Sequence, residues 1–216
     1  MENGKTYCIR NEQTKDFREV EELTRNAFWN LNVPGCNEHY LVHIMRNHPD
    51  FIPELDLILE ENNKIVGNIM YTKAKLVDET GYEKQILTFG PVSILPEYQR
   101  KGYGKALLEY SFEKAKEMSY DTIVIFGNPD NYVSRGFKSC KKYNICINDD
   151  FCPAAMLVKE LKEECLDGRK WYYIESNAYD LDEMAAEQFD SGFEKMEKEF
   201  RASQEEFYIH RHSKII

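Results

Sequence analysis

Hydrophobic and polar residues follow two different periods along the first half of this 216-residue chain. Residues 14–31 and 37–46 carry apolar side chains at helical spacing, and Thr14 is a candidate cap for the first helix. Residues 55–60, 64–77 and 83–95 have the composition of strands, with a turn at 61–63 between the first two. A short strand is also expected over 6–10. The pattern predicts one strand, two helices and a three-stranded meander.

The pattern after residue 95 predicts a crossover between two parallel strands. Apolar residues recur at helical spacing from about residue 103, and the apolar run 122–126 then reads as a buried strand. A helix is the connection that a parallel pair requires. A short helix over 128–132, a strand towards Ile147 and a final core strand over 154–161 follow. We therefore expect a mixed sheet with helices on both faces.

Gly90 and Pro91 interrupt the strand predicted over 83–95. Proline has no N–H to donate to a neighbouring strand, so this dipeptide is expected to force a bulge or a splay. Backbone groups near it are then left free for a ligand.

The sequence beyond residue 161 forms a separate unit in this interpretation. It turns through Asp167-Gly168, offers an aromatic strand over 171–175, and then runs acidic and helix-like over 180–201. Residues 205–209 read as another strand. We expect a domain over 1–161 and a C-terminal extension over 162–216, which packs on the core or forms a dimer contact rather than a substrate lid.

Composition limits the class of protein. The formal net charge is −10, and the basic residues are dispersed among acids, which opposes general affinity for nucleic acid. No apolar stretch is long enough to span a bilayer, and the first residues are polar rather than typical of a signal peptide. We therefore expect no membrane partner and a cytoplasmic protein. The acidic balance weakly favours a cationic amine ligand.

Cysteine and histidine spacing does not indicate a metal site. The six cysteines include no Cys-x-x-Cys pair, and we expect reduced thiols; Cys140, Cys146 and Cys152 match no zinc-ligand pattern. His39 and His43 have the spacing of a metal-binding pair, but no third ligand stands out, so surface or cleft-lining positions are expected.

Residues 99–106 (Gln-Arg-Lys-Gly-Tyr-Gly-Lys-Ala) lie between a predicted strand and a predicted helix. Glycines allow a tight turn, and successive N–H groups at a helix N-terminus can then bind one phosphate or pyrophosphate. Arg100, Lys101 and Lys105 add positive charge. This segment is therefore a candidate anion-binding loop.

Two common phosphate-binding motifs do not fit this loop. A Walker loop needs glycine where Gln99 stands and a hydroxyl residue where Ala106 stands. A dinucleotide fingerprint needs a third glycine where Leu107 stands. Nucleotide hydrolysis and NAD binding are both disfavoured.

The remaining motif is Gln-x-x-Gly-x-Gly, preceded by Gly-Pro-Val-Ser-Ile-Leu-Pro-Glu-Tyr over 90–98. It resembles the acetyl-CoA signature of the GNAT N-acetyltransferase superfamily, and the resemblance covers residues 6–161 in element order. It implies an α/β (α+β) fold with a mostly antiparallel central sheet, a splayed parallel strand pair that admits pantetheine, and helices on both faces. It also implies acetyl-CoA as co-substrate, no metal, and transfer of acetyl to a primary amine of a small molecule or peptide by direct attack.

The expected cofactor-binding residues come from three segments of the chain. They are Val92, Ser93 and Ile94, whose backbone N–H groups are candidates for polarising the thioester, then Gln99, Arg100, Lys101, Gly102, Tyr103, Gly104 and Lys105, and finally Asn128 and Asn131.

Tyr132 is the candidate general acid, because it stands four residues before Gly136-Phe137, where many superfamily members place a tyrosine near the coenzyme sulfur. A phenol stays protonated at neutral pH and can donate to the leaving thiolate. A packing role for its ring is the alternative. The general base is open between Glu54, Asp56 and ordered water.

Two other function classes remain open at this point. One is a non-catalytic acyl-CoA-binding sensor, which would not need Tyr132 as an acid. The other is a protein-interaction module that uses the acidic C-terminal extension. A homodimer is also possible.

Overall fold

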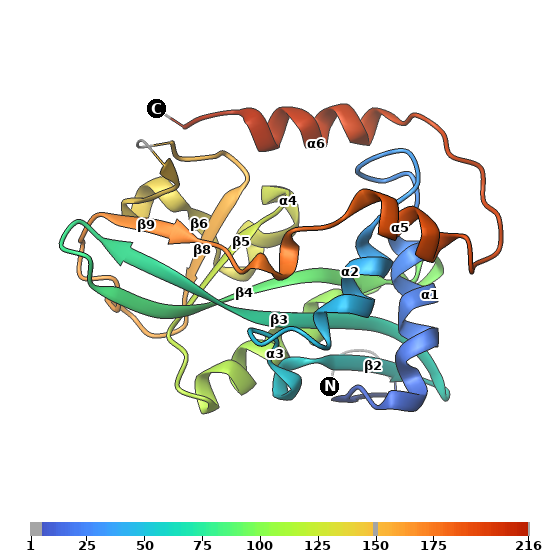
Figure 1. Cartoon of the computed structure of the whole chain (residues 1–216). Helices are drawn as coiled ribbons and strands as arrows, with labels where there is room; N and C mark the ends of the chain where they lie inside the picture. The colour runs from blue at the N-terminus through green and yellow to red at the C-terminus, as the bar shows by residue number, and fades with distance from the viewer. Residues whose placement is uncertain (1–5, 149–150, 216) are drawn as a thin grey trace.

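The computed structural model describes residues 6–148 and 151–215. Its strands (Figure 1) are β1 (Tyr7–Asn11), β2 (Leu57–Glu61), β3 (Lys64–Asp78), β4 (Glu83–Ile94), β5 (Thr122–Phe126), β6 (Lys138–Ser139), β7 (Ile145–Cys146), β8 (Met156–Glu160) and β9 (Trp171–Ile174). Its α-helices are α1 (Phe17–Phe28), α2 (Glu38–Met45), α3 (Tyr103–Glu117), α4 (Pro129–Tyr132), α5 (Glu183–Asp190) and α6 (Ala202–His212). A 3-10 turn, η7 (Asn177–Tyr179), precedes α5.

The described strands form one mixed sheet in the order β1-β2-β3-β4-β5-β8-β6, with β9 pairing to both β3 and β7. The pairs are antiparallel except β4 with β5 and β7 with β9. Because β9 pairs with both β3 and β7, this half of the sheet curls around a second hydrophobic core, which includes Trp171 and Tyr173. The predicted fold class, a mostly antiparallel mixed sheet with a splayed parallel pair, is confirmed.

The sheet opens beside Gly90-Pro91, as predicted. The β4–β5 register contains only Leu87 opposite Ile123, so the two strands part after that point. Opposite the dipeptide, the β3–β4 register shifts between Ile69 and Tyr71, and the Gly90-Pro91 peptide bond is cis. The opening therefore lies next to the segment in which the dipeptide disturbs the β3–β4 ladder.

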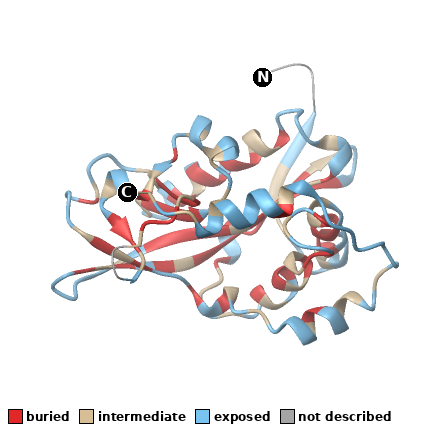
Figure 2. Ribbon diagram, turned by 90° about the horizontal axis from the view of Figure 1, so that it is seen from above, coloured by how far each residue is buried: buried red, intermediate tan, exposed pale blue. Residues whose placement is uncertain are grey.

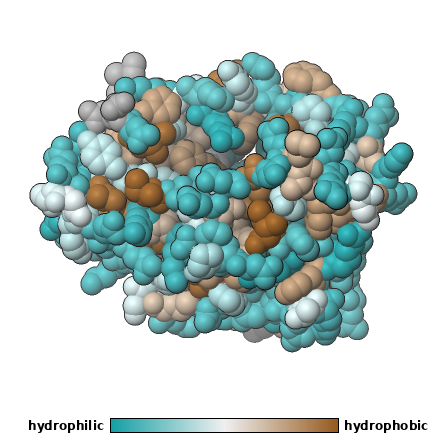
Figure 3. Space-filling view, in the orientation of Figure 1, coloured by the Kyte–Doolittle hydropathy of each residue, from teal (hydrophilic) through white to brown (hydrophobic). Residues whose placement is uncertain are grey.

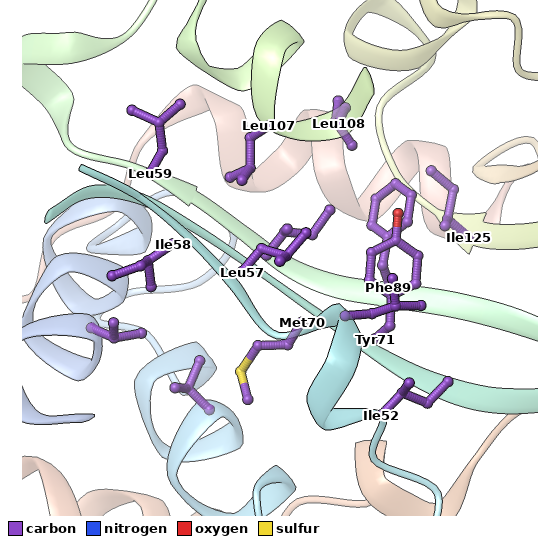
Figure 4. Packing of buried hydrophobic residues seen from close by; sticks show 14 of the residues in the cluster. Ile52, Leu57, Ile58, Leu59, Met70, Tyr71, Phe89, Leu107, Leu108 and Ile125 are labelled. Carbon is purple, nitrogen blue, oxygen red and sulfur yellow. The ribbon is translucent and has the colours of Figure 1, made fainter. Parts of the chain in front are cut away.

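Helices cover both faces of the sheet. On one face, the Tyr71 hydroxyl lies 2.8 Å from the Ser111 hydroxyl of α3; on the other, the Ser93 hydroxyl donates to the Thr24 hydroxyl of α1 at 3.0 Å. Figure 2 shows buried positions concentrated along the central strands. Figure 4 shows leucines of α3 on one side of the strands and Met70 on the other. This packing holds β3 and β4 rigidly beneath the opening.

The C-terminal extension packs along α1 and α2. Arg25 of α1 donates to Asp190 of α5 at 2.6 Å, and the Trp29 indole donates to the Glu197 carbonyl at 3.0 Å. The helix α6 is attached near both of its ends: the Ser203 hydroxyl donates to the Leu31 carbonyl at 2.8 Å, and the Ala154 N–H donates to the Ser213 carbonyl at 2.9 Å. In Figure 1, α6 spans the top of the molecule between these two regions. The domain boundary at residue 161 stays a prediction, although β9 joins the main sheet.

Besides the prediction for His39, four local predictions were wrong. Residues 205–209 lie in the helix α6 rather than in a strand, and only residues 183–190 of the segment 180–201 are α-helical. The first long helix begins at Phe17, after a 3-10 turn in which the Asp16 carboxylate accepts from the Gln13 N–H at 2.9 Å, so Thr14 does not cap it. Cys146 and Cys152 form a disulfide, so the six cysteines are not all reduced thiols.

His39 is fully buried beneath α5 and is not a surface or cleft residue. Its Nδ1 lies 3.4 Å from the Cys36 sulfur, and its Nε2 lies 3.1 Å from Asp190 Oδ1. Burial lowers the pKa of His39 to about 4 and raises that of the Cys36 thiol. Both groups are therefore neutral at pH 7, and the Cys-His-Asp arrangement stabilises the extension rather than providing a nucleophile.

We predict that acidification destabilises the fold through His39. An unfolded histidine binds a proton below pH about 6.5 and the folded one only below about 4, so stability falls as pH drops between these values, by up to about 3 kcal/mol. Urea unfolding of the wild type and of His39→Gln at several pH values measures this loss. The variant should show a weaker pH dependence, whereas His43→Gln, a half-exposed control on the same helix, should keep it. Equal slopes for wild type and His39→Gln would contradict the assignment.

Candidate functional site

The opening between β4 and β5 leaves backbone donors of β4 without a strand partner on that side. Leu95 N–H donates to the Val66 carbonyl of β3 at 3.0 Å. Because donor direction alternates along an antiparallel strand, the Ser93 N–H also points to β3, while those of Val92 and Ile94 point away from it. Val92 and Ile94 therefore present N–H groups on the side from which β5 has diverged.

Ser93 occupies the other side of this strand. It pairs with Asn68 of β3, and its side chain is fully buried against Thr24. Its contacts hold β4 against α1, so the backbone of Val92 and Ile94 is the part of this segment that faces the opening.

The glycine loop connects the end of β4 to α3. The Gln99 amide donates to the Ile94 carbonyl at 3.0 Å, which fixes the loop to the strand. Arg100 and Gly102 have positive φ values of 58° and 92°, and Gly102 is the N-cap of α3. Glycine adopts this conformation without the strain that a side chain brings.

The first turn of α3 contains backbone N–H groups that have no acceptor within the helix. The first bond of the helix runs from the Ala106 N–H to the Gly102 carbonyl at 3.0 Å, so the N–H groups of Gly104 and Lys105 have no acceptor within the helix. A Cβ on Gly104 would meet only Ile94, at 3.6 Å. The helix dipole adds partial positive charge at this end. These donors lie where the sequence predicts a binding place for an anion, and the binding itself stays a prediction.

Side chains of the loop differ in their surroundings. The Tyr103 hydroxyl donates to Glu61 and its ring packs against Tyr98, so this side chain anchors α3. The hydrogen bond to Glu61, and to a smaller extent burial, raises the pKa of Tyr103 to about 12. Lys101 Nζ lies 5.4 Å from the Tyr98 ring centroid. Lys105 Nζ lies 4.0 Å from a Glu109 carboxylate oxygen. The Lys101 and Lys105 side chains thus bring positive charge close to the loop.

Tyr132 ends α4 beside the opening. Its ring centroid lies 5.8 Å from that of Phe89 on β4 and 5.7 Å from that of Phe137. Burial raises its pKa to about 12. Gly127 makes this position possible, because a Cβ there would lie 2.6 Å from the Tyr132 ring. The phenol therefore stays protonated at neutral pH next to the strand that opens.

The two asparagines of this region lie in the turn before Tyr132. The Asn128 side chain accepts from the Asp130 N–H at 3.0 Å and caps α4. Asn131 is exposed, and its N–H donates to the Asn128 carbonyl at 3.0 Å. Asn128 has a structural role that accounts for its side-chain oxygen, while the exposed side chain of Asn131 is accessible.

Two cavities of the described residues lie apart from the opening. One, of about 280 Å³, is lined by the end of α2 and the segment after it, including His48, and by residues of η7 and Asp180. The other, of about 460 Å³, lies between α3 and Lys159. Neither includes residues 87–94 or 102–105 in its lining. Across 6–148 and 151–215, no group of three or more potential metal ligands is found, and no helix has the length and apolar character needed to cross a membrane.

Comparison with known proteins agrees with this geometry. A family model described as the acetyltransferase (GNAT) family matches residues 14–139, which is more than half of the chain. The chain belongs to the GNAT acetyltransferase family. The GNAT resemblance read from the glycine loop is thereby confirmed.

A curated relative supports the same family. The uncharacterized N-acetyltransferase YjhQ of Escherichia coli (strain K12) is 30% identical over 125 residues, which span 58% of this chain and 66% of that protein. The alignment therefore leaves about a third of the relative's length unmatched.

Solved GNAT structures share the fold at low sequence identity. The Escherichia coli GNAT protein YhbS, solved in complex with CoA, has a TM-score of 0.71 at 18% identity, with 84% of this chain and 96% of that chain covered. A Brucella melitensis GNAT acetyltransferase, solved in complex with acetyl-CoA, has a TM-score of 0.63 at 21% identity, with 81% and 98% covered. Residues 1–161 make up about three quarters of this chain, so the YhbS match extends into the C-terminal extension.

The two carboxylates considered as bases for this GNAT protein lie at the start of β2. Glu54 is exposed. Asp56 is buried, accepts from the Asn68 amide at 3.2 Å and lies beside Glu12, and burial, more than Glu12, raises its pKa well above the usual range. Both are separated from β4 by β3, which lies between β2 and β4 in the sheet.

Sequence reasoning missed the residues that the extension brings to the opening. The Tyr179 hydroxyl of η7 donates to the Gly90 carbonyl at 3.3 Å, across 89 positions of sequence. Tyr173 of β9 lies with its ring 5.9 Å from that of Phe126, at the end of β5. The aromatic run 171–173 was the available signal, but no local pattern assigns it to residue 90.

Proposed function

We propose that this GNAT protein is an N-acetyltransferase that moves an acetyl group from acetyl-CoA to a primary amine by direct attack in a ternary complex. The observation that carries the proposal is the convergence on one opening of the Val92 and Ile94 N–H groups, the α3 N-terminus and the protonated Tyr132 phenol. The CoA and acetyl-CoA complexes of the two similar structures support acetyl-CoA as the co-substrate.

Each group has a separate task in this reaction. The first turn of α3 and the loop before it bind the pyrophosphate of the coenzyme through backbone N–H groups. The pantetheine arm lies between β4 and β5, where the Val92 or Ile94 N–H polarises the thioester carbonyl and stabilises the oxyanion. Asn131 lies within the same turn as Tyr132 and is available to the arm.

In the proposed reaction, Tyr132 is the general acid that protonates the leaving thiolate. The neutral amine nitrogen forms a bond to the carbonyl carbon, and the tetrahedral intermediate collapses as the carbon–sulfur bond breaks. The leaving thiolate takes the phenolic proton, and Tyr132 regains a proton from the nitrogen of the former amine. A non-catalytic sensor would bind the same coenzyme without this exchange.

We predict that Tyr132→Phe slows acetyl transfer by about a hundredfold to ten-thousandfold while leaving coenzyme A affinity nearly unchanged, because it removes the proton donor and keeps the ring. Single-turnover rates on a responsive amine, followed by free-thiol release, separate chemistry from product release. Tyr110→Phe, at an exposed position of α3, is the matched control and should keep the wild-type rate. Wild-type rates in Tyr132→Phe would make Tyr132 a packing residue.

We also predict that Gly104→Ala weakens coenzyme A binding at least about tenfold without destabilising the fold. The added methyl meets Ile94 at an ordinary distance, so the free energy of unfolding should stay constant or rise by up to about 1 kcal/mol, but the methyl stands where a phosphate approaches the helix N–H groups. Calorimetry and urea unfolding measure both quantities.

Two further variants can be compared with Gly104→Ala. Lys105→Ala should weaken binding less, because an exposed charge contributes only about 0 to 1 kcal/mol. Gly102→Ala is a poorer test, since its positive φ strains the fold whatever the ligand does. Unchanged affinity in Gly104→Ala would remove the first turn of α3 from the binding site.

A further inference from the structure

The cavity of about 460 Å³ lies between the middle of α3 and the segment that follows Tyr132. Its walls come from three parts of the chain: Glu109, Phe112, Glu113 and Lys116 of α3, then Ser134, Arg135 and Gly136, and finally Lys159 of β8. The chemistry proposed at the opening makes no use of these residues. A concave site that combines an aromatic floor with several charged side chains is suited to a polar ligand.

Both walls of this cavity continue from the proposed coenzyme site. Glu109 lies one helix turn, about 5.4 Å, beyond Lys105 of the first turn of α3. Its carboxylate lies 4.0 Å from Lys105 Nζ and 3.9 Å from Arg135 Nη1. The other wall begins at Tyr132, because the 3-10 turn that ends at Arg135 directly follows α4. The cavity is therefore the next space along α3 after the proposed pyrophosphate site.

Arg135 lines the cavity with hydrogen-bond donors that the protein does not use. Its side chain makes no hydrogen bond within residues 6–148 and 151–215, and its 3.9 Å contact with Glu109 is longer than the roughly 3.0 Å of an N–H···O bond. The backbone around it is fixed, since the Gly136 N–H donates to the Val133 carbonyl at 3.0 Å. A guanidinium held in this way can bind two oxygens of one anion.

Lys159 adds a second cation to the same cavity. Its Nζ donates to the Arg135 carbonyl at 2.7 Å, lies 5.1 Å from the Phe112 ring centroid, and has no acidic partner among the residues that the structure describes. Gly136 leaves the space for it, because a Cβ there would lie 2.7 Å from Nζ. Burial, and then Lys116, lowers the pKa of Lys159. An anion in the cavity would stabilise this partly buried ammonium.

The charges around the cavity are positive on balance. It carries two carboxylates, Glu109 and Glu113, and with its edge four cations: Lys105, Lys116, Arg135 and Lys159. Of these cations Lys116 alone has a carboxylate within hydrogen-bond distance in the described chain, at 2.8 Å from Glu113. The whole protein has a formal net charge of −10, so this cavity differs in sign from its surroundings.

We propose that Arg135 and Lys159 form a site for a phosphate monoester, and that the 3′-phosphate of coenzyme A occupies it. The planar guanidinium donates to two phosphate oxygens, and the ammonium adds a point charge. The adenosine then lies along α3, between the first turn and the cavity. The proposal rests on the proposed function for the position of the pyrophosphate. It gives this protein a preference for coenzyme A over its 3′-dephospho form.

Calorimetry with coenzyme A and with 3′-dephospho-coenzyme A, at one pH and ionic strength, tests the site. The wild type should bind coenzyme A at least about tenfold more tightly, and Arg135→Gln should reduce this ratio at least about threefold, because charge-assisted hydrogen bonds are lost. Glu109→Gln should raise the ratio, since it removes a competing carboxylate. Lys162→Gln, at an exposed position just after β8, is the matched control and should keep the wild-type ratio.

The fold itself should tolerate Arg135→Gln, because this change removes no hydrogen bond made by the side chain in the described structure. Urea unfolding of the same samples checks that the free energy of unfolding is unchanged. Lys159→Gln should also reduce the ratio, but it removes the bond to the Arg135 carbonyl, so it is interpreted only together with its unfolding curve.

Titration with inorganic phosphate, followed by NMR of the Arg135 and Lys159 side chains, distinguishes the source of the phosphate. Saturable shifts that Arg135→Gln abolishes, with an unchanged coenzyme ratio in that variant, would keep the site and overturn the coenzyme as its occupant. An unchanged ratio without saturable shifts would overturn the site. If neither form of the coenzyme binds while phosphate does, the proposed function fails and the phosphate site stands.

Discussion

The loss of strand pairing after Leu87 is the constraint on which the rest of the structure depends. A backbone N–H away from water must find an acceptor, and a sheet normally provides one at every second residue. Here β5 diverges from β4 after one aligned pair, while β4 continues to Ile94 and stays bonded to β3 on its other edge. The strand is therefore rigid on one side and chemically open on the other, which is the condition for preorganised binding of a carbonyl oxygen.

The elements around the opening are held by interactions that do not involve a ligand. The Gln99 amide ties the loop to β4, Tyr103 ties α3 to Glu61 of β2, and Asn128 caps α4. These contacts fix the positions of the α3 N-terminus and of Tyr132 relative to β4. Preorganisation of this kind lowers the cost of binding, because little has to be ordered when the ligand arrives.

The C-terminal extension contacts the sheet and the helices α1 and α2 at several points. It adds β9 to β3, seats Asp190 between Arg25 and the buried His39, and brings Tyr179 to Gly90. Through these contacts the two halves of the sheet and the helices α1 and α2 are linked on the side away from α3. This side of the opening is consequently built from segments far apart in sequence.

The sequence predicts the parts of the site that depend on local chemistry. The glycine loop, the interruption at Gly90-Pro91 and the turn before Tyr132 are short segments whose conformation follows from glycine, proline and capping residues. Residues 205–209 were misread because Glu-Glu-Phe-Tyr-Ile suits either a strand or a helix, and the attachments of α6 to Leu31 and Ala154 are tertiary. The burial of His39 and the Cys146–Cys152 disulfide likewise depend on chain positions that no local pattern joins.

Amide hydrogen exchange measured by NMR, with and without coenzyme A, tests most directly whether the opening between β4 and β5 holds the coenzyme. The account predicts that saturating coenzyme A slows exchange at Val92 and Ile94 and in the first turn of α3, while the amides of β2, two strands away, exchange at unchanged rates. Coenzyme A binding, established by calorimetry in the same buffer, without any slowing at Val92 and Ile94 would contradict it.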